Sequence, residues 1–513
     1  MSPPDRQTRR ARLGPLVYGL LLVAITVGVR LPAIMQHHAI DDEVNYSVVA
    51  RQLMDGGLLY VDVVERRPPA TFWLYEGVFR LFGRENFFAL HLVGTAWVLL
   101  TMLAMYIAAS RLFGRRAGFA AALFYGVFQP WWYWDNLAFN GEVLMNLPVA
   151  AAYALCVGAT RTREWMRLAA AGAVVVVGFL LKQPAAVAAI PLLIYLLHPA
   201  RSRAVGLTIA DRFRAVAWLA AGAVAVLAPI GVWLVAHGIM REALYWSIFD
   251  HDVPLIYFDK AVEHTAAFVA LTCPMLAAAL WSLRSTDGWR RFPAERDAFL
   301  WLLVVSAIAA AASGRFYPHY YIGMLPALSI LAAPAAAPLA LAAPVSARRV
   351  AILGIAWIAC AAIGTFVNQA IAGARQPAMT EAGLYLRQHG DAAARVFVWG
   401  RTPRIYLDSN RRPAARYIDT FPLTGRIFGP SRGPVDTSSR VQPWAWDQLR
   451  EDFRAHPPAF IVDTQSLPGA EYPVALFPWL GTLLREDYSE VAKVAEGTIY
   501  SRLPKSSEKR ISE

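Results

Sequence analysis

The sequence predicts a mainly α-helical, polytopic membrane protein of about 11 transmembrane helices, with amphipathic helices on its outer face and a small soluble α/β domain after them. Of its 513 residues, 57% are hydrophobic and 17% are charged, whereas soluble domains average about 45–50% apolar and about 25% charged residues. Apolar runs of roughly 18 or more residues, long enough to cross about 30 Å of hydrocarbon, recur over the first three quarters of the chain. After residue 373 these runs stop.

The first apolar run follows a cluster of arginines and is too long for a signal-peptide core, so we expect it to remain as a span. The predicted spans are 13–34, 86–110, 117–133, 143–160, 168–182, 184–198, 215–237, 263–283, 298–313, 319–344 and 350–372.

The distribution of arginine between these spans predicts the orientation. Short basic clusters, such as Arg115-Arg116 and Arg290-Arg291, lie in the connectors on the same side as the N-terminus. The positive-inside rule places that side in the cytoplasm. The segment 168–198 has arginine-rich flanks and an interruption only at Lys182, so we predict a hairpin of two short helices with Lys182 at its outer tip. The net charge of +12 reflects this orientation pattern, and we reject nucleic-acid binding.

The alternation of short strand-like and helical stretches in residues 374–513 predicts a separate α/β domain of about 140 residues. Strand-like stretches occur at 395–399, 460–463 and 498–502, and helical ones at 380–388 and 446–455. Eleven spans that start from a cytoplasmic N-terminus would place this domain outside the cytoplasm.

Acids and arginines gather in the first outer loop, residues 35–85. On a helix that starts near Asp42, the side chains of Tyr46, Val49 and Leu53 share its face, which predicts a helix along the membrane with a free acidic N-terminus. A carboxylate there can accept a proton, and the planar guanidinium of Arg67 suits a phosphate. The alternative is that the acids only cap the helix and the arginines contact lipid headgroups. The candidate residues in this loop are Asp41, Asp42, Glu43, Tyr46, Glu65, Arg66 and Arg67.

Five further residues are candidates at the same outer surface. Glu142 opens the fourth span and is favoured over Asp135 as a second acid, because a carboxylate that faces lipid would be costly. Lys182 either binds phosphate or extends to the interface. His319 is either a structural hydrogen-bonding residue or part of the site, and Arg315 is the better candidate for phosphate.

These residues resemble a known family. The resemblance covers about residues 1–345 and is with the membrane glycosyltransferases of the C-type fold, which include the protein O-mannosyltransferases and the lipid A aminoarabinose transferases. Its motifs are Asp42-Glu43-x-x-Tyr46-x-x-x-Ala50-x-x-Leu53, Arg67-Pro68-Pro69-x-x-x-Trp73, Phe79-Arg80-Leu81-Phe82-Gly83, the segment Gly178 to Lys182, and His319-Tyr320-Tyr321-x-x-x-Leu325-Pro326.

The resemblance implies an inverting transfer of a sugar from a polyprenyl phosphate, with the acid near Asp42 at the reaction centre. It also implies that Glu65 and Arg67 line the donor phosphate, sometimes with a divalent metal ion. Two departures are notable. Arg67 stands where the family has a lysine, and the additional acid Asp41 leaves open which carboxylate is the base.

We therefore expect residues 1–373 to form a transmembrane glycosyltransferase domain and residues 374–513 an extracytoplasmic one, in a bacterial inner membrane. The partners would be a polyprenyl-phosphate sugar and a lipid, glycan or protein acceptor. No nucleotide or redox cofactor is expected. The alternative functions are a transporter or flippase for prenyl or anionic lipids, and a structural subunit. The sequence does not identify the sugar or the acceptor.

Overall fold

The computed structural model of the protein describes residues 6–157, 164–250, 256–285, 287–336, 345–425, 437–467 and 469–504. The chain divides into two compact units. The helical unit comprises Met1–Glu43 and Arg67–Gln376, and the α/β unit comprises Val44–Arg66 and Pro377–Glu513.

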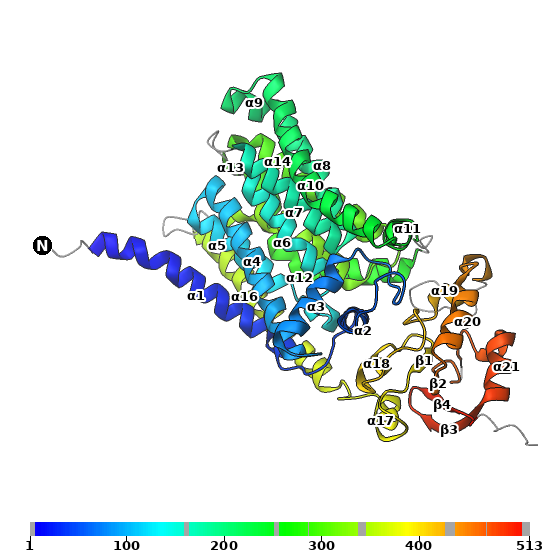
Figure 1. The fold of residues 1–513 in the computed structure, drawn as a ribbon. Coiled ribbons are helices and arrows are strands. Elements are labelled where there is room, and N and C mark those ends of the chain that lie inside the picture. Colours follow the sequence, from blue (N-terminus) through cyan, green and yellow to red (C-terminus); the bar gives the residue numbers. More distant parts are fainter. Residues whose placement is uncertain are drawn as a thin grey trace, which may run out of the picture. The chain divides into compact units, whose positions relative to one another are not determined.

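Helices of very different length make up the helical unit (Figure 1). The longer helices are α1 (Arg6–Ile34), α3 (Ala70–Phe82), α4 (Phe87–Phe113), α5 (Arg115–Phe128), α6 (Gly141–Cys156), α7 (Glu164–Leu181), α8 (Ala189–Leu197), α10 (Ile209–Ala236), α12 (Phe258–Ser285), α14 (Pro293–Ala311), α15 (Leu325–Ala332) and α16 (Val345–Ala374). The short ones are η1 (Trp134–Leu137), η2 (Gln183–Ala188), α9 (Pro199–Val205), α11 (Met240–Leu244), η3 (Tyr245–Phe249), α13 (Asp287–Arg291), η4 (Pro318–Met324) and η5 (Ala333–Ala336).

Within the described residues, six helices are long and apolar enough to cross a membrane, namely α1, α4, α7, α10, α12 and α16. The number rises to seven if the bent pair Gln183–Leu197 and Pro199–Val205 forms one span. The other predicted spans are also helical, but α5, α6, α8 and α15 are shorter than a full span and α14 begins with a charged turn. The last residues of the predicted spans 143–160 and 319–344 lie outside the described residues. The protein is a multi-pass membrane protein.

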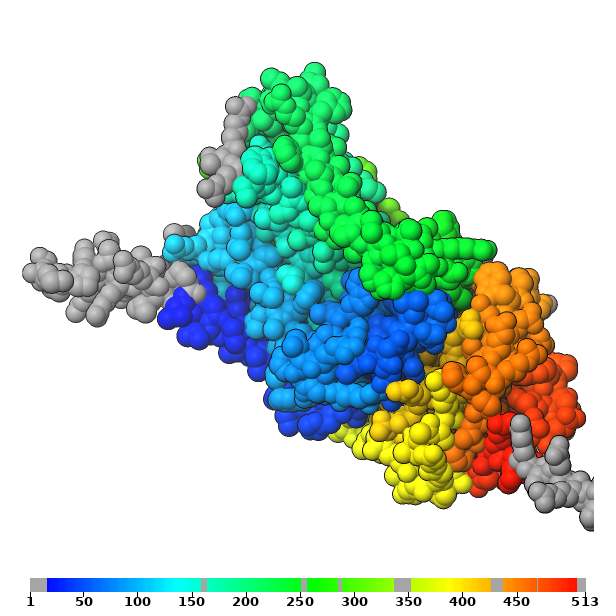
Figure 2. Space-filling model, in the orientation of Figure 1, coloured from blue at the N-terminus to red at the C-terminus, as the bar shows by residue number. Residues whose placement is uncertain are grey.

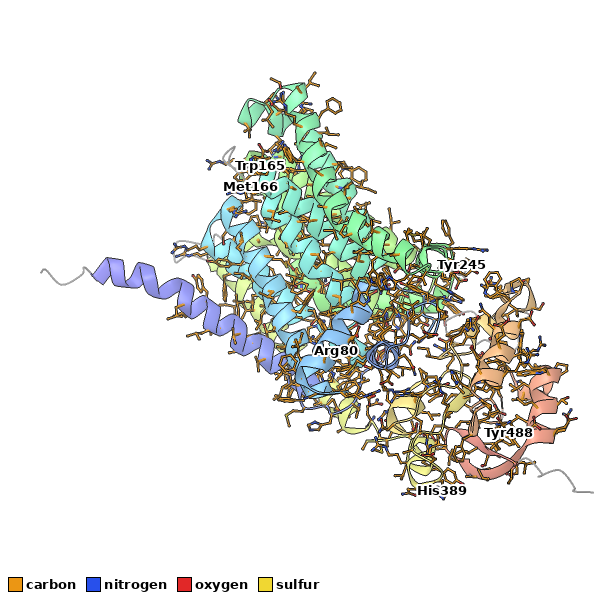
Figure 3. All side chains as sticks on the ribbon, in the orientation of Figure 1. Arg80, Trp165, Met166, Tyr245, His389 and Tyr488 are labelled. Atoms are coloured by element: carbon orange, nitrogen blue, oxygen red, sulfur yellow. The ribbon has the colours of Figure 1, made fainter. Side chains whose placement is uncertain are left out.

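The connectors of the helical unit gather at two opposite ends, as the alternation of charge predicts. At the basic end, His198 Nε2 lies 3.2 Å from Asp297 Oδ2, and the rings of Phe113 and Phe292 are 5.6 Å apart. Trp165, at the start of α7, lies at this end (Figure 3). The candidate acids and arginines of the helical unit lie at the other end, which we call the acidic end.

The predicted hairpin at 168–198 is confirmed. Arg201, just after α8, forms an ion pair with Glu164 at the start of α7, so the chain returns to the basic end. Lys182 has extended backbone angles between α7 and η2 and marks the turning point.

Small residues allow close helix packing in this bundle. A Cβ atom on Gly172 of α7 would lie 1.8 Å from the carbonyl oxygen of Leu219, and one on Gly222 of α10 would lie 1.7 Å from that of Ala169. The outer helices expose large apolar side chains, such as Val232 on α10 and Leu353 on α16, which suits contact with lipid. In Figure 2, α9 and the start of α10 project from one end of the helical unit.

A four-stranded sheet in the order β1-β2-β4-β3 forms the centre of the α/β unit (Figure 1). Its strands are β1 (Val396–Trp399), β2 (Phe460–Asp463), β3 (Tyr488–Val494) and β4 (Gly497–Arg502). β1 and β2 are parallel, with Val396 opposite Phe460, whereas β4 is antiparallel to both β2 and β3. The helices are α17 (Glu381–Gln388), α18 (Arg404–Asp408), α19 (Phe421–Thr424), η6 (Ser438–Arg440), α20 (Ala445–Ala455), η7 (Val474–Leu476) and α21 (Pro478–Asp487).

The α/β unit also contains the middle of the first loop, including most of α2 (Glu43–Met54). Asp55 pairs with Arg412 at 2.9 Å, and the amide of Val64 donates to the carbonyl oxygen of Arg416 at 2.9 Å. The predicted helix at this position is confirmed. The prediction that it lies along the membrane with a free acidic N-terminus is wrong, because Glu43 and the side chains from Tyr46 to Gln52 are buried.

Candidate functional site

Two loops at the acidic end carry carboxylates. The acidic loop (residues 39–42) lies between α1 and α2, and the aromatic loop (residues 131–140) lies between α5 and α6. Asp41 has a φ of 47°, in the left-handed region that Asp tolerates better than most residues.

Asp42 forms an ion pair with Arg67. The distance between Asp42 Oδ2 and Arg67 Nη2 is 2.9 Å, and each side chain is about one fifth exposed, at 21% and 20%. Pro68 and Pro69 follow directly, and Pro69 is the N-cap of α3, so the backbone after Arg67 is stiff. A guanidinium that remains accessible to solvent on a fixed backbone is suited to binding a phosphate.

Asp41 and Asp135 lie in each other's electrostatic field. Water reaches the Asp41 side chain, but protein surrounds it densely, and this desolvation together with the charges of Asp42 and Asp135 raises its pKa well above the usual value. Desolvation also raises the pKa of Asp135, with a smaller contribution from Asp42, while His319 opposes the shift. Carboxyl groups with raised pKa values are better proton acceptors near neutral pH.

A buried ion pair lies beside these acids. Glu142, in the first turn of α6, pairs with Lys182. Both side chains are buried, and the Lys182 ammonium lies 5.3 Å from the centre of the Tyr320 ring. Gly141 provides the space, because a Cβ atom there would lie 2.4 Å from Lys182 Cδ.

His319 in η4 is buried and stacks on Tyr317, with ring centres 5.6 Å apart. Among the described residues, no group hydrogen-bonds to its Nδ1 atom. It lies in the electrostatic field of Asp135 and of Glu142. Arg315, just before η4, is half-buried. Burial raises the pKa of Tyr320, and the charge of Arg315 partly opposes this shift.

Three loops at this end contain strained backbone. Besides Asp41, Trp132 has a φ of 46° and Phe316 a φ of 51°. For bulky residues such angles are uncommon, and each costs about 1–3 kcal/mol. Such strain is concentrated at functional sites, so it supports a functional role for the three loops.

The candidate residues are divided between the two units. Tyr46, Glu65 and Arg66 belong to the α/β unit, whereas Asp41, Asp42, Glu43, Arg67, Asp135, Glu142, Lys182, Arg315 and His319 belong to the helical unit. Arg66 lies 6.0 Å from the centre of the Phe421 ring. The two neighbouring arginines, which the sequence suggests as a pair, are therefore assigned to different units.

Glu43 is fully buried and accepts three hydrogen bonds. The donors are the amide of Ile40 at 2.8 Å, the amide of Phe139 at 2.5 Å and His91 Nε2 at 2.9 Å. His91, Arg30 and Tyr320 were not among the candidate site residues predicted from the sequence. The signal for His91 and Arg30 was present, because an ionisable residue inside an apolar run usually has a function.

The described residues contain no group of three or more His, Cys, Asp or Glu side chains that could hold a metal ion. The arrangement at the acidic end can nevertheless accept a proton, at Asp41, Asp42 or Asp135, and can neutralise an anion, at Arg67, Lys182 or Arg315.

A sequence model of the dolichyl-phosphate-mannose-protein mannosyltransferase family matches residues 66–233. No curated protein sequence matches the chain. Among solved structures, ArnT from Cupriavidus metallidurans bound to undecaprenyl phosphate matches with a TM-score of 0.61 and 14% identity, over 95% of this chain and 98% of that chain. The fold is that of the C-type membrane glycosyltransferases.

Oligosaccharyltransferases share this fold. AglB from Archaeoglobus fulgidus, in complex with an inhibitory peptide and a dolichol-phosphate, matches with a TM-score of 0.54 and 13% identity, over 96% of this chain and 75% of that chain. The oligosaccharyltransferase of the same organism in complex with Zn and sulfate matches with a TM-score of 0.52 and 14% identity, over 94% and 73%. The predicted fold class and the predicted resemblance to the C-type membrane glycosyltransferases are confirmed.

Proposed function

We propose that the protein is a membrane glycosyltransferase that moves a sugar from a polyprenyl-phosphate donor to an acceptor hydroxyl. The observation that carries the proposal is the ion pair of Asp42 and Arg67 at the acidic end, beside Asp41 and Asp135. The comparisons support the choice of donor, because the ArnT structure contains undecaprenyl phosphate and the AglB structure a dolichol-phosphate.

The reaction would be a single displacement that inverts the anomeric carbon. The acceptor oxygen attacks this carbon while the bond to the phosphate oxygen breaks, and the polyprenyl phosphate leaves with the electron pair. Arg67 would hold the phosphate, with Lys182 and Arg315 adding positive charge, because fixed cations stabilise the charge that develops on the leaving group. Glu142 would orient the sugar.

One member of the Asp41–Asp42 pair would take the acceptor proton. Asp42 is paired with Arg67 and would therefore lie next to the donor phosphate, whereas Asp41 has a carboxyl group with a raised pKa. Because the two carboxylates interact, they titrate as a pair, and separate substitutions are needed to assign the base. The reaction would take place on the extracytoplasmic face of a bacterial inner membrane, with the N-terminus and the basic end in the cytoplasm.

If a divalent metal ion takes part, we propose that it binds at the donor phosphate. Since the described residues show no cluster of metal ligands, no step is assigned to a metal. Transfer measured before and after treatment with a chelator will establish whether an ion is needed.

The test is the transfer of radiolabelled sugar from a panel of polyprenyl-phosphate sugars by detergent-purified protein. We expect Asp42→Asn to reduce transfer by at least about 100-fold, in line with the loss of a general base, with unchanged expression. Asp447→Asn is the control, since Asp447 pairs with Arg450 at 2.7 Å in an exposed ion pair of α20. Wild-type rates in the Asp42 variant would contradict the assignment. Donor-independent uptake of lipid by vesicles would instead favour a transporter.

A further inference from the structure

Below the acidic loop, three ionisable side chains are fully buried in the helical unit. Arg30 comes from α1, Glu43 from the first turn of α2, and His91 from α4, and each has no exposed surface. Burying one charge without a partner is costly. Here Arg30 and Glu43 interact electrostatically and so offset each other's charge.

Arg30 binds to three parts of the surrounding structure. Its Nη1 atom donates to Gln129 Oε1 at 2.7 Å, its Nη2 atom to the carbonyl oxygen of Leu137 at 2.8 Å, and its Nε atom to Thr95 Oγ1 at 3.3 Å. The bond to Leu137 attaches the aromatic loop directly to α1.

Glu43 attaches the same loop from the other side. One carboxylate oxygen accepts from the amide of Phe139, and the other accepts from the amide of Ile40 and from His91. A carboxylate can only accept hydrogen bonds, so His91 must donate from its Nε2 atom. Ala33, Ile40, Leu137 and Ala138 form a buried apolar cluster next to these bonds, which limits the freedom of both loops.

We propose that Arg30, Glu43 and His91 form a positioning network that fixes the acidic loop against the aromatic loop, and so fixes Asp41 and Asp42 relative to Asp135. Glu43 is then a positioning residue and does not contact the substrate, because its oxygens are already used by the protein. Arg30 and His91 act through it. The activity part of this inference rests on the proposed function, whereas the geometry does not.

The first test compares His91→Phe with His91→Gln. Phe removes the donor to Glu43, whereas the Gln amide can replace it. We expect kcat to fall about 10- to 100-fold in His91→Phe, the loss that follows a displacement of about 1 Å, with KM for the donor little changed. Most of the activity should remain in His91→Gln.

The second test follows the titration of the Asp41 carboxyl by infrared difference spectroscopy, with Asp41→Asn identifying its band. Asp41 is faced by Asp42, Asp135 and Arg67. If the two loops separate, the electrostatic field of Asp135 at Asp41 weakens. The titration midpoint of Asp41 should therefore fall in His91→Phe and stay at the wild-type value in His91→Gln. This measurement needs no turnover, and it therefore tests the network even if the protein proves not to be a transferase.

The matched control is His198→Phe, which removes a similar His–Asp contact at the basic end, where His198 Nε2 lies 3.2 Å from Asp297 Oδ2. We expect lower thermal stability without a change in the Asp41 midpoint. If His91→Phe does not fold, Glu43→Asp takes its place, since it keeps the charge but shortens the side chain. An unchanged midpoint and kcat in the substituted protein, or equal changes in His198→Phe, would overturn the proposal.

Discussion

Gly141→Ala tests whether the buried ion pair of Glu142 and Lys182 has a role in the reaction. The new Cβ atom would lie 2.4 Å from Lys182 Cδ and 3.2 Å from both its Cγ and its Cε. An ordinary contact between carbon atoms requires at least 3.4 Å, so the lysine must move by about 1 Å. A hydrogen bond stretched by that distance is lost.

The expected loss of activity follows from this displacement. A shift of about 1 Å in a positioned group can reduce turnover about 100-fold, and we expect a loss of 10- to 100-fold in sugar transfer. The loss of stability should be smaller, about 1–3 kcal/mol, as for other overpacked sites, because the lysine side chain is flexible and alanine is the better helix former.

The assay is transfer from the polyprenyl-phosphate sugar, with thermal unfolding measured on the same samples. Gly323→Ala is the matched control, because its Cβ would lie 2.8 Å from the Cε atom of Met145, a comparable steric conflict at the same end without an ion pair. If Gly141→Ala retained full activity, or if the control lost as much, the ion pair would have no role in the reaction.

Two further predictions concern stability. Burial raises the pKa of Asp419 to about 6. The folded state therefore binds this proton more tightly than the unfolded state does, and the free energy of unfolding should fall by about 1–3 kcal/mol as pH rises from about 4 through 6. Asp419→Asn should weaken this dependence in thermal unfolding of the full chain, because Asp463, whose pKa burial also raises to about 6, keeps its own contribution. The exposed Asp447→Asn should leave the dependence unchanged. Gly222→Ala should lower the unfolding temperature strongly, because its Cβ would lie 1.7 Å from the carbonyl oxygen of Ala169. Gly231→Ala is the control and should leave the unfolding temperature nearly unchanged, because its Cβ would have only one contact, at 3.8 Å. Similar unfolding temperatures in both variants would contradict the close packing of α7 and α10.

Much of the secondary structure could be predicted from the sequence because it depends on local patterns. β2 was predicted at 460–463 and lies there, and α17 and α20 start within one residue of their predicted positions. β3 was missed, because it is an edge strand whose exposed positions mix charged residues, such as Glu490 and Lys493, with Val491, so its sequence lacks a regular apolar alternation.

The number of full spans was predicted less well. Hydropathy reports composition, whereas a span also requires a continuous helix. The described part of the run 319–344 is divided into η4, α15 and η5. Pro326 lies in the first turn of α15, and proline lacks the amide that would continue the preceding helix.

The sequence by itself determined that this is a membrane protein, that its candidate acids lie at the end opposite the short basic clusters, and that its first loop resembles that of C-type glycosyltransferases. These properties follow from composition and from short motifs. Only the tertiary structure decided how the motif is divided. Arg67 pairs with Asp42 in the helical unit, whereas Arg66 contacts Phe421 in the α/β unit. The tertiary structure also decided that Glu43 is buried. Its partners His91 and Phe139 are 48 and 96 residues away in the chain, and contacts over such separations leave no local pattern from which the burial could be predicted.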